Sequence, residues 1–262
     1  MLRKNGMKAK LKAGKVPIGA IVLIPDPSLA ELLGLCGFDY LLFDGEHGAI
    51  TPDILERLVR ACDSSGVVAM ARLPVNTADA MLPYLETGIL GAMLPHSRSA
   101  AQVAEFVNAC KYAPLGRRGV GTGRATAYGT ISTADHIREW NEEFFTIAQV
   151  EDQEAIDDLA NITRIAGLDA CYVGSNDLSQ AIGFAGRPDD PEFRRIQAQI
   201  AANIKRGGKW VGLGARPPFT SGEASRLRGM GADFFSFSYV GFLTRATKDL
   251  VRESRALVSP GG

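Results

Sequence analysis

Short apolar runs alternate with longer amphipathic segments along almost the whole chain. Eight runs have the length of a buried strand: residues 18–24, 40–43, 67–73, 91–95, 145–150, 170–174, 210–214 and 234–238. They show little alternation of apolar and polar positions, which is typical of parallel strands buried on both faces. Segments with helical periodicity lie between them, for example 54–64, 78–87, 100–112, 154–166 and 191–206.

This alternation of strands and helices over about 250 residues predicts an α/β protein with a (β/α)8 barrel, the TIM barrel. The main alternative is a doubly wound open sheet. That fold calls for a glycine-rich turn after the first strand, and Pro-Asp-Pro-Ser at 25–28 is not one. No Gly/Ser-rich linker divides the chain, so we expect residues 1–262 to form a single barrel domain. The segment 243–258, after the eighth strand, is predicted to be helical.

The regular spacing breaks once, between Tyr112 and Phe145. This excursion contains a glycine-rich stretch at 114–124, and loops of such length in a compact domain are usually functional or interfacial. Its backbone N–H groups could cradle an anion. It matches neither a Walker motif nor a dinucleotide fingerprint, so we expect no nucleotide cofactor.

Composition narrows the class of partner. The chain has 29 basic and 29 acidic residues and 46% apolar residues, so it lacks the basic surface that nucleic acids and anionic membranes require. No run approaches the ~18 apolar residues of a membrane span, and no apolar signal core follows the N-terminus. The four cysteines, Cys36, Cys62, Cys110 and Cys171, are scattered, which predicts reduced thiols in a cytoplasmic protein and argues against zinc.

Polar side chains follow several predicted strands at their C-terminal ends. They are Asp44, Glu46, His47, Arg72, His96, Gln149, Glu151 and Asp177. In a (β/α)8 barrel these ends meet at one mouth, where the chemistry of such enzymes lies. The convergence of so many polar groups therefore indicates an active site.

Glu151 and Asp177 end two consecutive buried strands, the fifth and sixth. Two carboxylates held close together need a cation, and oxygen ligands favour a hard divalent metal such as Mg²⁺ or Mn²⁺. Carboxylates at strand ends are also common helix N-caps, and Asp177 could begin a helix. The pair, taken with the other groups at the mouth, favours a metal site.

His47 is the candidate base. A carboxylate such as Asp44 that accepts a hydrogen bond from one imidazole nitrogen makes the other nitrogen a better base. Arg72 either pairs with Asp44 or stabilises a carboxylate or developing enolate oxygen. Glu46 either supports the loop or holds metal-bound water, and His96 and His136 are expected to be structural.

No lysine is predicted to point inward from a barrel strand. Lys111, Lys205, Lys209 and Lys248 fall on helices or before strands, and the others lie in the first fifteen residues. A Schiff-base mechanism is therefore not expected, and a metal would have to activate a carbonyl group.

Four segments carry a resemblance to a known family. They are GFDYLLFDGEH at 37–47, YAPLGRRGVG at 112–121, AQVE at 148–151 and VGSNDLS at 173–179. Together they resemble the HpcH/HpaI family of class II, metal-dependent 2-keto acid (pyruvate) aldolases. Within that family the resemblance is to enzymes of the 4-hydroxy-2-oxoheptanedioate aldolase type. The resemblance extends from about residue 8 to the C-terminal helix.

The resemblance implies a (β/α)8 barrel with a divalent cation (Mg²⁺, Mn²⁺ or Co²⁺) on Glu151 and Asp177. Pyruvate would bind that metal through its keto oxygen and one carboxylate oxygen. Arg72 would stabilise the enolate oxygen, and His47 with Asp44 would transfer protons. Gln149 would place substrate or water, and backbone N–H groups near Ser175 and Asp177 would hold the carboxylate.

The resemblance also implies a homohexamer, a trimer of dimers that exchange a C-terminal helix. The chain departs from the family pattern at three positions, the first of them in the turn that would hold the pyruvate carboxylate. Ser175 replaces a usual proline, Glu86 replaces an aspartate, and Arg124 lies in a segment shorter than usual. Arg124 is the candidate to bind a distal carboxylate of the aldehyde, and the alternative is an arginine at a subunit interface.

The sequence thus predicts an aldolase that reversibly cleaves a 4-hydroxy-2-keto acid to pyruvate and an aldehyde through a metal-bound pyruvate enolate. One alternative is a related metal-enolate lyase that acts on an acyl-CoA or an oxaloacetate-like acid. It would need a basic entry groove, for which Arg117, Arg118 and Arg124 are the local candidates. A second alternative is a non-catalytic barrel that binds a keto acid, against which the base at His47 argues.

Overall fold

In the computed structural model, which describes residues 4–216 and 219–258, eight parallel strands form one closed barrel in chain order. The last strand pairs with the first, and Ile18 lies opposite Phe235. The strands are β1 (Ile18–Val22), β2 (Tyr40–Asp44), β3 (Val68–Arg72), β4 (Gly91–Leu94), β5 (Phe145–Val150), β6 (Ala170–Val173), β7 (Trp210–Ala215) and β8 (Phe234–Ser238). The predicted (β/α)8 fold is confirmed.

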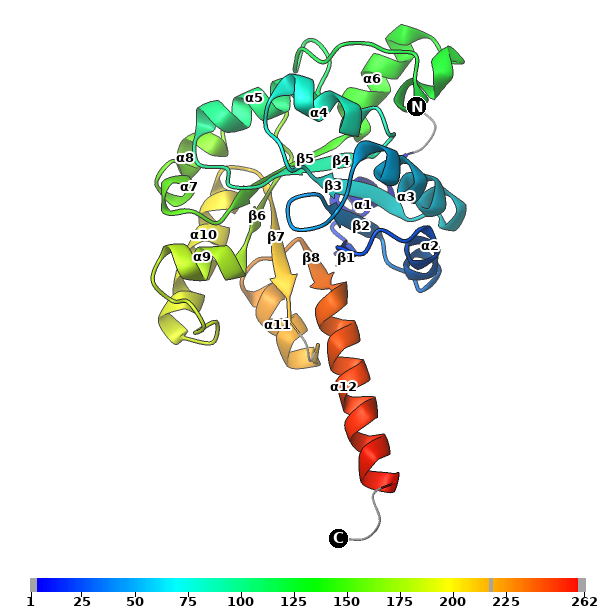
Figure 1. The fold of residues 1–262 in the computed structure, drawn as a ribbon. Helices are drawn as coiled ribbons and strands as arrows, with labels where there is room; N and C mark the ends of the chain where they lie inside the picture. The colour runs from blue at the N-terminus through cyan, green and yellow to red at the C-terminus, as the bar shows by residue number, and fades with distance from the viewer. Residues whose placement is uncertain (1–3, 217–218, 259–262) are drawn as a thin grey trace.

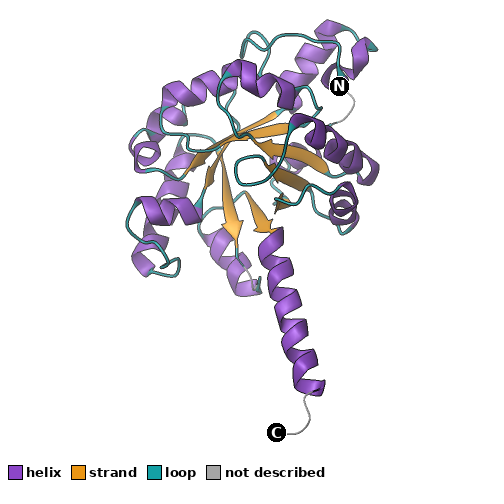
Figure 2. Ribbon diagram, viewed as in Figure 1, coloured by secondary structure: helices purple, strands orange, loops and turns teal. Residues whose placement is uncertain are grey.

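Helices surround the ring of strands (Figure 2). They are α1 (Gly6–Lys12), α2 (Pro27–Leu35), α3 (Pro52–Ser65), α4 (Ala78–Leu85), α5 (Ala100–Cys110), η1 (Arg124–Gly129), α6 (Thr133–Glu143), α7 (Gln153–Asp157), α8 (Leu159–Ile162), α9 (Ser175–Ala181), α10 (Pro191–Arg206), α11 (Ser221–Gly229) and α12 (Tyr239–Val258). Most connect one strand to the next, as the alternating pattern predicts.

Two segments differ from their predicted form. The excursion after Tyr112 contains η1 and α6, and α6 begins where the Ser132 hydroxyl accepts the N–H of Asp135 at 3.1 Å. The predicted helix at 154–166 is broken into α7 and α8 at Asp158. The Asp158 carboxylate accepts the Ala100 N–H at 2.6 Å, so it caps the neighbouring α5.

The barrel core consists of two layers because successive residues of a strand point to opposite faces. Tyr40, Leu42 and other inward side chains fill the barrel, whereas Leu41 and Phe43 pack against the helices. Met7 and Leu11 of α1 belong to the inner cluster and close the amino end of the barrel. The carboxyl ends of the strands are therefore the open mouth.

The last helix, α12, begins at Tyr239, four residues before the predicted start. It projects away from the barrel (Figure 1), and none of its described residues is buried. Within residues 4–216 and 219–258, no helix is long and apolar enough to cross a membrane.

Candidate active site

A cavity of about 310 Å³ opens at the carboxyl ends of the strands. Its lining includes Asp44, His47, Arg72, Gln149, Ser175 and Asp177, six of the residues predicted from the sequence. Glu151 is buried behind this lining, next to Gln149 and Gly174. The fold thus brings together side chains that are up to 133 positions apart in the sequence, from Asp44 to Asp177.

Asp44 and Arg72 form the fixed centre of the site. They are direct register partners at the ends of β2 and β3. Arg72 Nε donates to Asp44 Oδ1 at 2.9 Å and Nη2 donates to Oδ2 at 2.5 Å, a bidentate pair. Burial acts to raise the pKa of Asp44, but Arg72 and two backbone N–H groups outweigh it and hold that pKa below its ordinary value.

The predicted contact between the Asp44 carboxylate and the His47 imidazole is wrong. Asp44 Oδ1 accepts the backbone N–H groups of Glu46 and His47 at 3.1 and 3.2 Å, and the Arg72 fork occupies both oxygens. The imidazole instead stands at the open mouth, 56% exposed, with Nε2 3.8 Å from Glu46 Oε2. The β2–β3 register explains the difference, because it sets Arg72 directly opposite Asp44.

Glu46 and His96 link the mouth to the fifth strand. Glu46 Oε2 lies 3.0 Å from Arg72 Nη1, and its Oε1 lies 3.3 Å from His96 Nε2. His96 Nδ1 contacts Asp152 Oδ2 at 2.9 Å. Burial opposes the charged imidazole, but Asp152, Glu151 and Glu46 outweigh it and raise the pKa of His96.

Glu151 is the most constrained carboxylate of the site. The His96 backbone N–H donates to its Oε1 at 2.9 Å, and the Gln149 amide donates to its Oε2. The absence of a side chain at Gly174 leaves space for the Glu151 carboxylate, since a Cβ at Gly174 would lie 2.3 Å from Glu151 Oε2. Burial raises the pKa of Glu151 to about 7, and the Asp177 charge adds to that rise.

Asp177 lies in the first turn of α9, whose N-cap is Gly174. Asp152, not Glu151, is the N-cap of α7. Neither predicted metal ligand is therefore an N-cap residue, although Asp177 lies in the first helical turn, where a carboxylate favours the helix dipole. Ser175, at the start of α9, is held by Gln197, whose Nε2 donates to Ser175 Oγ at 2.8 Å.

The carboxylate pair fits a divalent cation. A buried carboxylate whose pKa is raised by burial and by a second carboxylate is stabilised when a cation binds. The donors are oxygens, and each carboxylate oxygen of Glu151 keeps a second lone pair beside its present hydrogen bond. Among the described residues no group of three or more His, Cys, Asp or Glu could hold a metal, so substrate and water would complete the shell.

The candidate acceptor residue Arg124 does not line this cavity. It begins η1, is paired with Asp63 of α3, and packs against Gly88. Glu86 is similarly engaged, because its Oε1 lies 2.7 Å from Arg118 Nη2. His136 is buried and contacts the Tyr112 hydroxyl at 3.1 Å, in keeping with its predicted structural role.

Sequence analysis missed Arg216 at the mouth and gave His96, which it placed there, only a structural role. Arg216 lines the cavity directly after β7, and an arginine that follows an apolar strand was the available signal. His96 contacts Glu151 through its backbone N–H and has a left-handed φ of 45°. A backbone contact of this kind has no sequence signature.

Fold and cavity together define a (β/α)8-barrel enzyme with a carboxylate-rich site at the mouth. The sequence profile of the HpcH/HpaI aldolase/citrate lyase family matches residues 20–213. The chain belongs to this family, as its sequence motifs predicted.

Named relatives agree with this assignment. The chain is 32% identical over 248 residues to a 5-keto-4-deoxy-D-glucarate aldolase of Klebsiella pneumoniae, covering 94% of this chain and 95% of the relative. It is 33% identical over 215 residues to a hydroxypyruvate/pyruvate aldolase of Agrobacterium fabrum, covering 80% and 79%. The crystal structure of an HpcH/HpaI aldolase from Desulfitobacterium hafniense superimposes with a TM-score of 0.90 at 29% identity, covering 97% and 98%. The predicted enzyme class, aldolase, is confirmed.

Proposed function

We propose that this protein is a divalent-metal-dependent aldolase that reversibly cleaves a 4-hydroxy-2-keto acid into pyruvate and an aldehyde. The observation that carries the proposal is the pairing of a buried Glu151 with Asp177 beside the Asp44–Arg72 ion pair. This arrangement supports a site in which the two carboxylates bind a cation and Arg72 binds a negatively charged oxygen beside it. We propose Mg²⁺, Mn²⁺ or Co²⁺ as the cation.

In this proposal Glu151 and Asp177 hold the metal, which when bound supplies a Lewis acid for the keto group of the substrate. Arg72 donates to the oxygen that becomes negative during cleavage, and its bidentate pair with Asp44 fixes its guanidinium for that task. Gln149 connects the two parts, since it accepts from Arg72 Nη1 at 3.4 Å and donates to Glu151. Backbone N–H groups at the start of α9, near Ser175 and Asp177, bind the substrate carboxylate.

His47 is the proposed base. It accepts the proton of the C4 hydroxyl, the C3–C4 bond breaks, and the electron pair remains with the pyruvate half as the enolate. The aldehyde leaves, and a proton delivered to C3 yields pyruvate. The position of His47 on the cavity lining, together with its exposure, supports proton exchange with both substrate and solvent.

An acyl-CoA substrate is less well supported by the residues around the mouth. A basic groove for the CoA phosphates would have to use Arg117, Arg118 and Arg124. Arg118 is buried beside Glu86 and stacks 3.9 Å from the Trp140 ring centroid, and Arg124 is paired with Asp63. Of the three, Arg117 alone is exposed.

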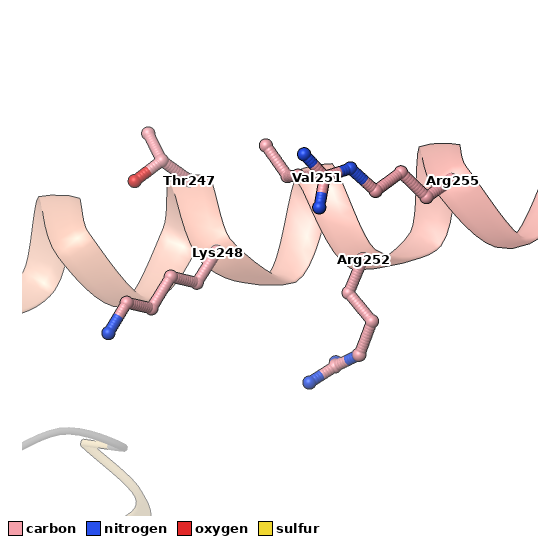
Figure 3. A pocket seen from close by; sticks show the side chains of 5 residues that line it. All are labelled: Thr247, Lys248, Val251, Arg252 and Arg255. Atoms are coloured by element: carbon pink, nitrogen blue, oxygen red, sulfur yellow. The ribbon is translucent and has the colours of Figure 1, made fainter.

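We also propose that the protein is a homo-oligomer, a hexamer built from dimers, in which α12 packs on another copy of the chain. Phe242, Leu250 and Leu257 of α12 are 63%, 63% and 86% exposed. Figure 3 shows a hollow lined by five residues of this single helix. A helix with such an apolar face gains most of its stability from packing, which supports a partner at this surface.

The experiment that tests the function is a coupled assay for pyruvate release across a panel of 4-hydroxy-2-keto acids. We expect release from several members of the panel, and aldol addition when pyruvate and the matching aldehyde are supplied. A purified, folded protein that binds pyruvate and the metal but cleaves no member of the panel would contradict the proposal.

A further inference from the structure

The turn after β4 is bound closely to the end of β5. The Ser97 N–H donates to the Gln149 carbonyl at 3.2 Å, and the His96 N–H donates to Glu151 Oε1 at 2.9 Å. The His96 ring adds a third contact, because its Nδ1 lies 2.9 Å from Asp152 Oδ2. One residue, His96, thus contacts the side chains of both acidic residues that follow β5.

The backbone of His96 has an unusual conformation that makes its contact with Glu151 possible. Its φ is 45°, in the left-handed region that residues with a Cβ rarely adopt. The turn is closed by the Arg98 N–H, which donates to the His96 carbonyl at 2.8 Å. Conformations of this kind persist only where the surrounding contacts hold them, and they concentrate at functional sites. Here the result is an N–H group aimed at a buried carboxylate.

The imidazole of His96 is held at both of its nitrogens. In addition to the Asp152 contact at Nδ1, its Nε2 lies 3.3 Å from Glu46 Oε1. The other oxygen of Glu46 lies 3.0 Å from Arg72 Nη1. The ring therefore ties the turn after β4 to the end of β5 and to the loop after β2. In the part of the chain that the structure describes, His96 is not among the residues that line the cavity, so its ring acts on neighbouring side chains.

These contacts fix the orientation of Glu151. Its Oε1 accepts the His96 N–H and its Oε2 accepts the Gln149 amide, so each oxygen offers its remaining lone pair in a set direction. We propose that His96 is a positioning residue of the metal site: its left-handed backbone orients Glu151 for a divalent cation, and its imidazole holds that backbone in place. This inference rests on the proposed function, which assigns the cation to Glu151 and Asp177.

The test is calorimetric titration of Mn²⁺ into the full-length protein after chelator treatment. His96→Ala loses both ring contacts but keeps an unfavourable φ, and it should weaken Mn²⁺ binding by roughly 10–100-fold, the usual effect of losing a group that orients a metal ligand. His96→Gly accepts the left-handed φ without the ring contacts and should give an intermediate affinity. His96→Asn should recover most of the loss, because asparagine tolerates this φ and its amide can contact Asp152 where Nδ1 does.

Arg98→Met is the matched control. Arg98 Nε contacts the same Asp152 oxygen at 3.3 Å, but its side chain is 58% exposed and belongs to the surface. This variant should keep the wild-type affinity for Mn²⁺. Loss of a positive charge beside the cation would strengthen Mn²⁺ binding, so weaker binding in His96→Ala separates positioning from an effect of charge.

Unchanged or tighter Mn²⁺ binding in His96→Ala, an equal loss in Arg98→Met, or no recovery in His96→Asn would overturn the inference. If His96→Ala does not fold, the comparison of His96→Gly with His96→Asn decides in the same way. Turnover of the variants that stays low at saturating Mn²⁺ would also overturn it, since a positioning residue of the metal site acts through metal binding. A wild type that binds no Mn²⁺ would instead defeat the proposed metal-dependent function itself.

Discussion

At the scale of single residues, the bidentate pair between Asp44 and Arg72 is the contact on which the site depends. Asp44 is 1% exposed, and its carboxylate accepts four hydrogen bonds, two from Arg72 and two from the backbone of the following turn. It orients Arg72 and also fixes the turn that carries His47. Asp44 therefore positions the proposed catalytic groups Arg72 and His47 without being paired to the imidazole.

Asp44→Asn should destabilise the protein at neutral pH by about 3 kcal/mol, because it removes the charge of the bidentate partner of a buried guanidinium and leaves only the single ion-pair contact with Glu46. The pKa of Asp44 is lower in the folded than in the unfolded protein, so its contribution to stability is present above its ordinary pKa, 3.8, and is lost as the pH falls below that value. Urea unfolding of the wild type and of Asp44→Asn at pH 7 and pH 3 measures the difference in their free energies of unfolding. A difference between variant and wild type that is the same at both pH values would contradict the argument.

His47→Ala should lower kcat for cleavage by roughly 10²–10⁴, the usual contribution of a general base. Pyruvate affinity should change little, because Arg72, Gln149 and the carboxylates are assigned to pyruvate. Steady-state kinetics and pyruvate titration separate the two effects. A variant with normal kcat and weak pyruvate binding would show that His47 binds substrate and does not move the proton.

The site could be predicted from the sequence to the extent that strand ends mark it. Glu151, Asp177, Arg72 and Gln149 follow or end apolar runs, so their convergence follows from the fold. The partner of Asp44 was left open between His47 and Arg72, because the choice depends on which residue the β2–β3 register sets opposite Asp44. The backbone contact from His96 to Glu151 depends on a left-handed φ at a non-glycine residue, which periodicity does not encode.

At the scale of elements, uninterrupted apolar runs located all eight strands, whereas helix boundaries were less evident. The break between α7 and α8 comes from a tertiary contact, the capping of α5 by Asp158. Lys111, at the end of α5, makes another tertiary contact. Its Nζ donates to the carbonyls of Phe144 and Asn141 and so ties α5 to the end of α6, well away from the cavity.

Burial lowers the pKa of Lys111 to about 8, from an ordinary value of 10.5. Between these values the unfolded chain binds more protons than the folded one, so the Lys111 contribution makes unfolding less favourable as the pH rises. The difference in unfolding free energy between wild type and Lys111→Met should therefore shift in favour of the wild type from pH 8 to pH 10. The exposed Lys12→Met is the control and should show no such shift. Parallel pH profiles for wild type and Lys111→Met would rule the effect out.

At the scale of the whole molecule, the barrel is closed and its amino end is covered by α1, whereas α12 contacts the core through Tyr239 at its start and is mostly exposed along the rest of its length. Deletion of residues 243–258 should dissociate the proposed oligomer, because it removes the apolar face that carries Leu250. Leu250→Asp should do the same, and Lys248→Asp on the same helix should not. Sedimentation velocity measures the assembly. A wild type that is monomeric at micromolar concentration would contradict the proposed role of α12.

In the proposed function Glu151 and Asp177 hold a divalent cation on which cleavage depends, and metal removal tests this dependence most directly. Chelator-treated protein should release no pyruvate from a 4-hydroxy-2-keto acid, and Mg²⁺, Mn²⁺ or Co²⁺ should restore the release. Glu151→Gln and Asp177→Asn should bind the cation weakly in calorimetric titration and stay inactive, whereas the exposed Glu154→Gln should behave as wild type. Full pyruvate release in excess chelator, with a substrate imine trapped by borohydride, would contradict the account.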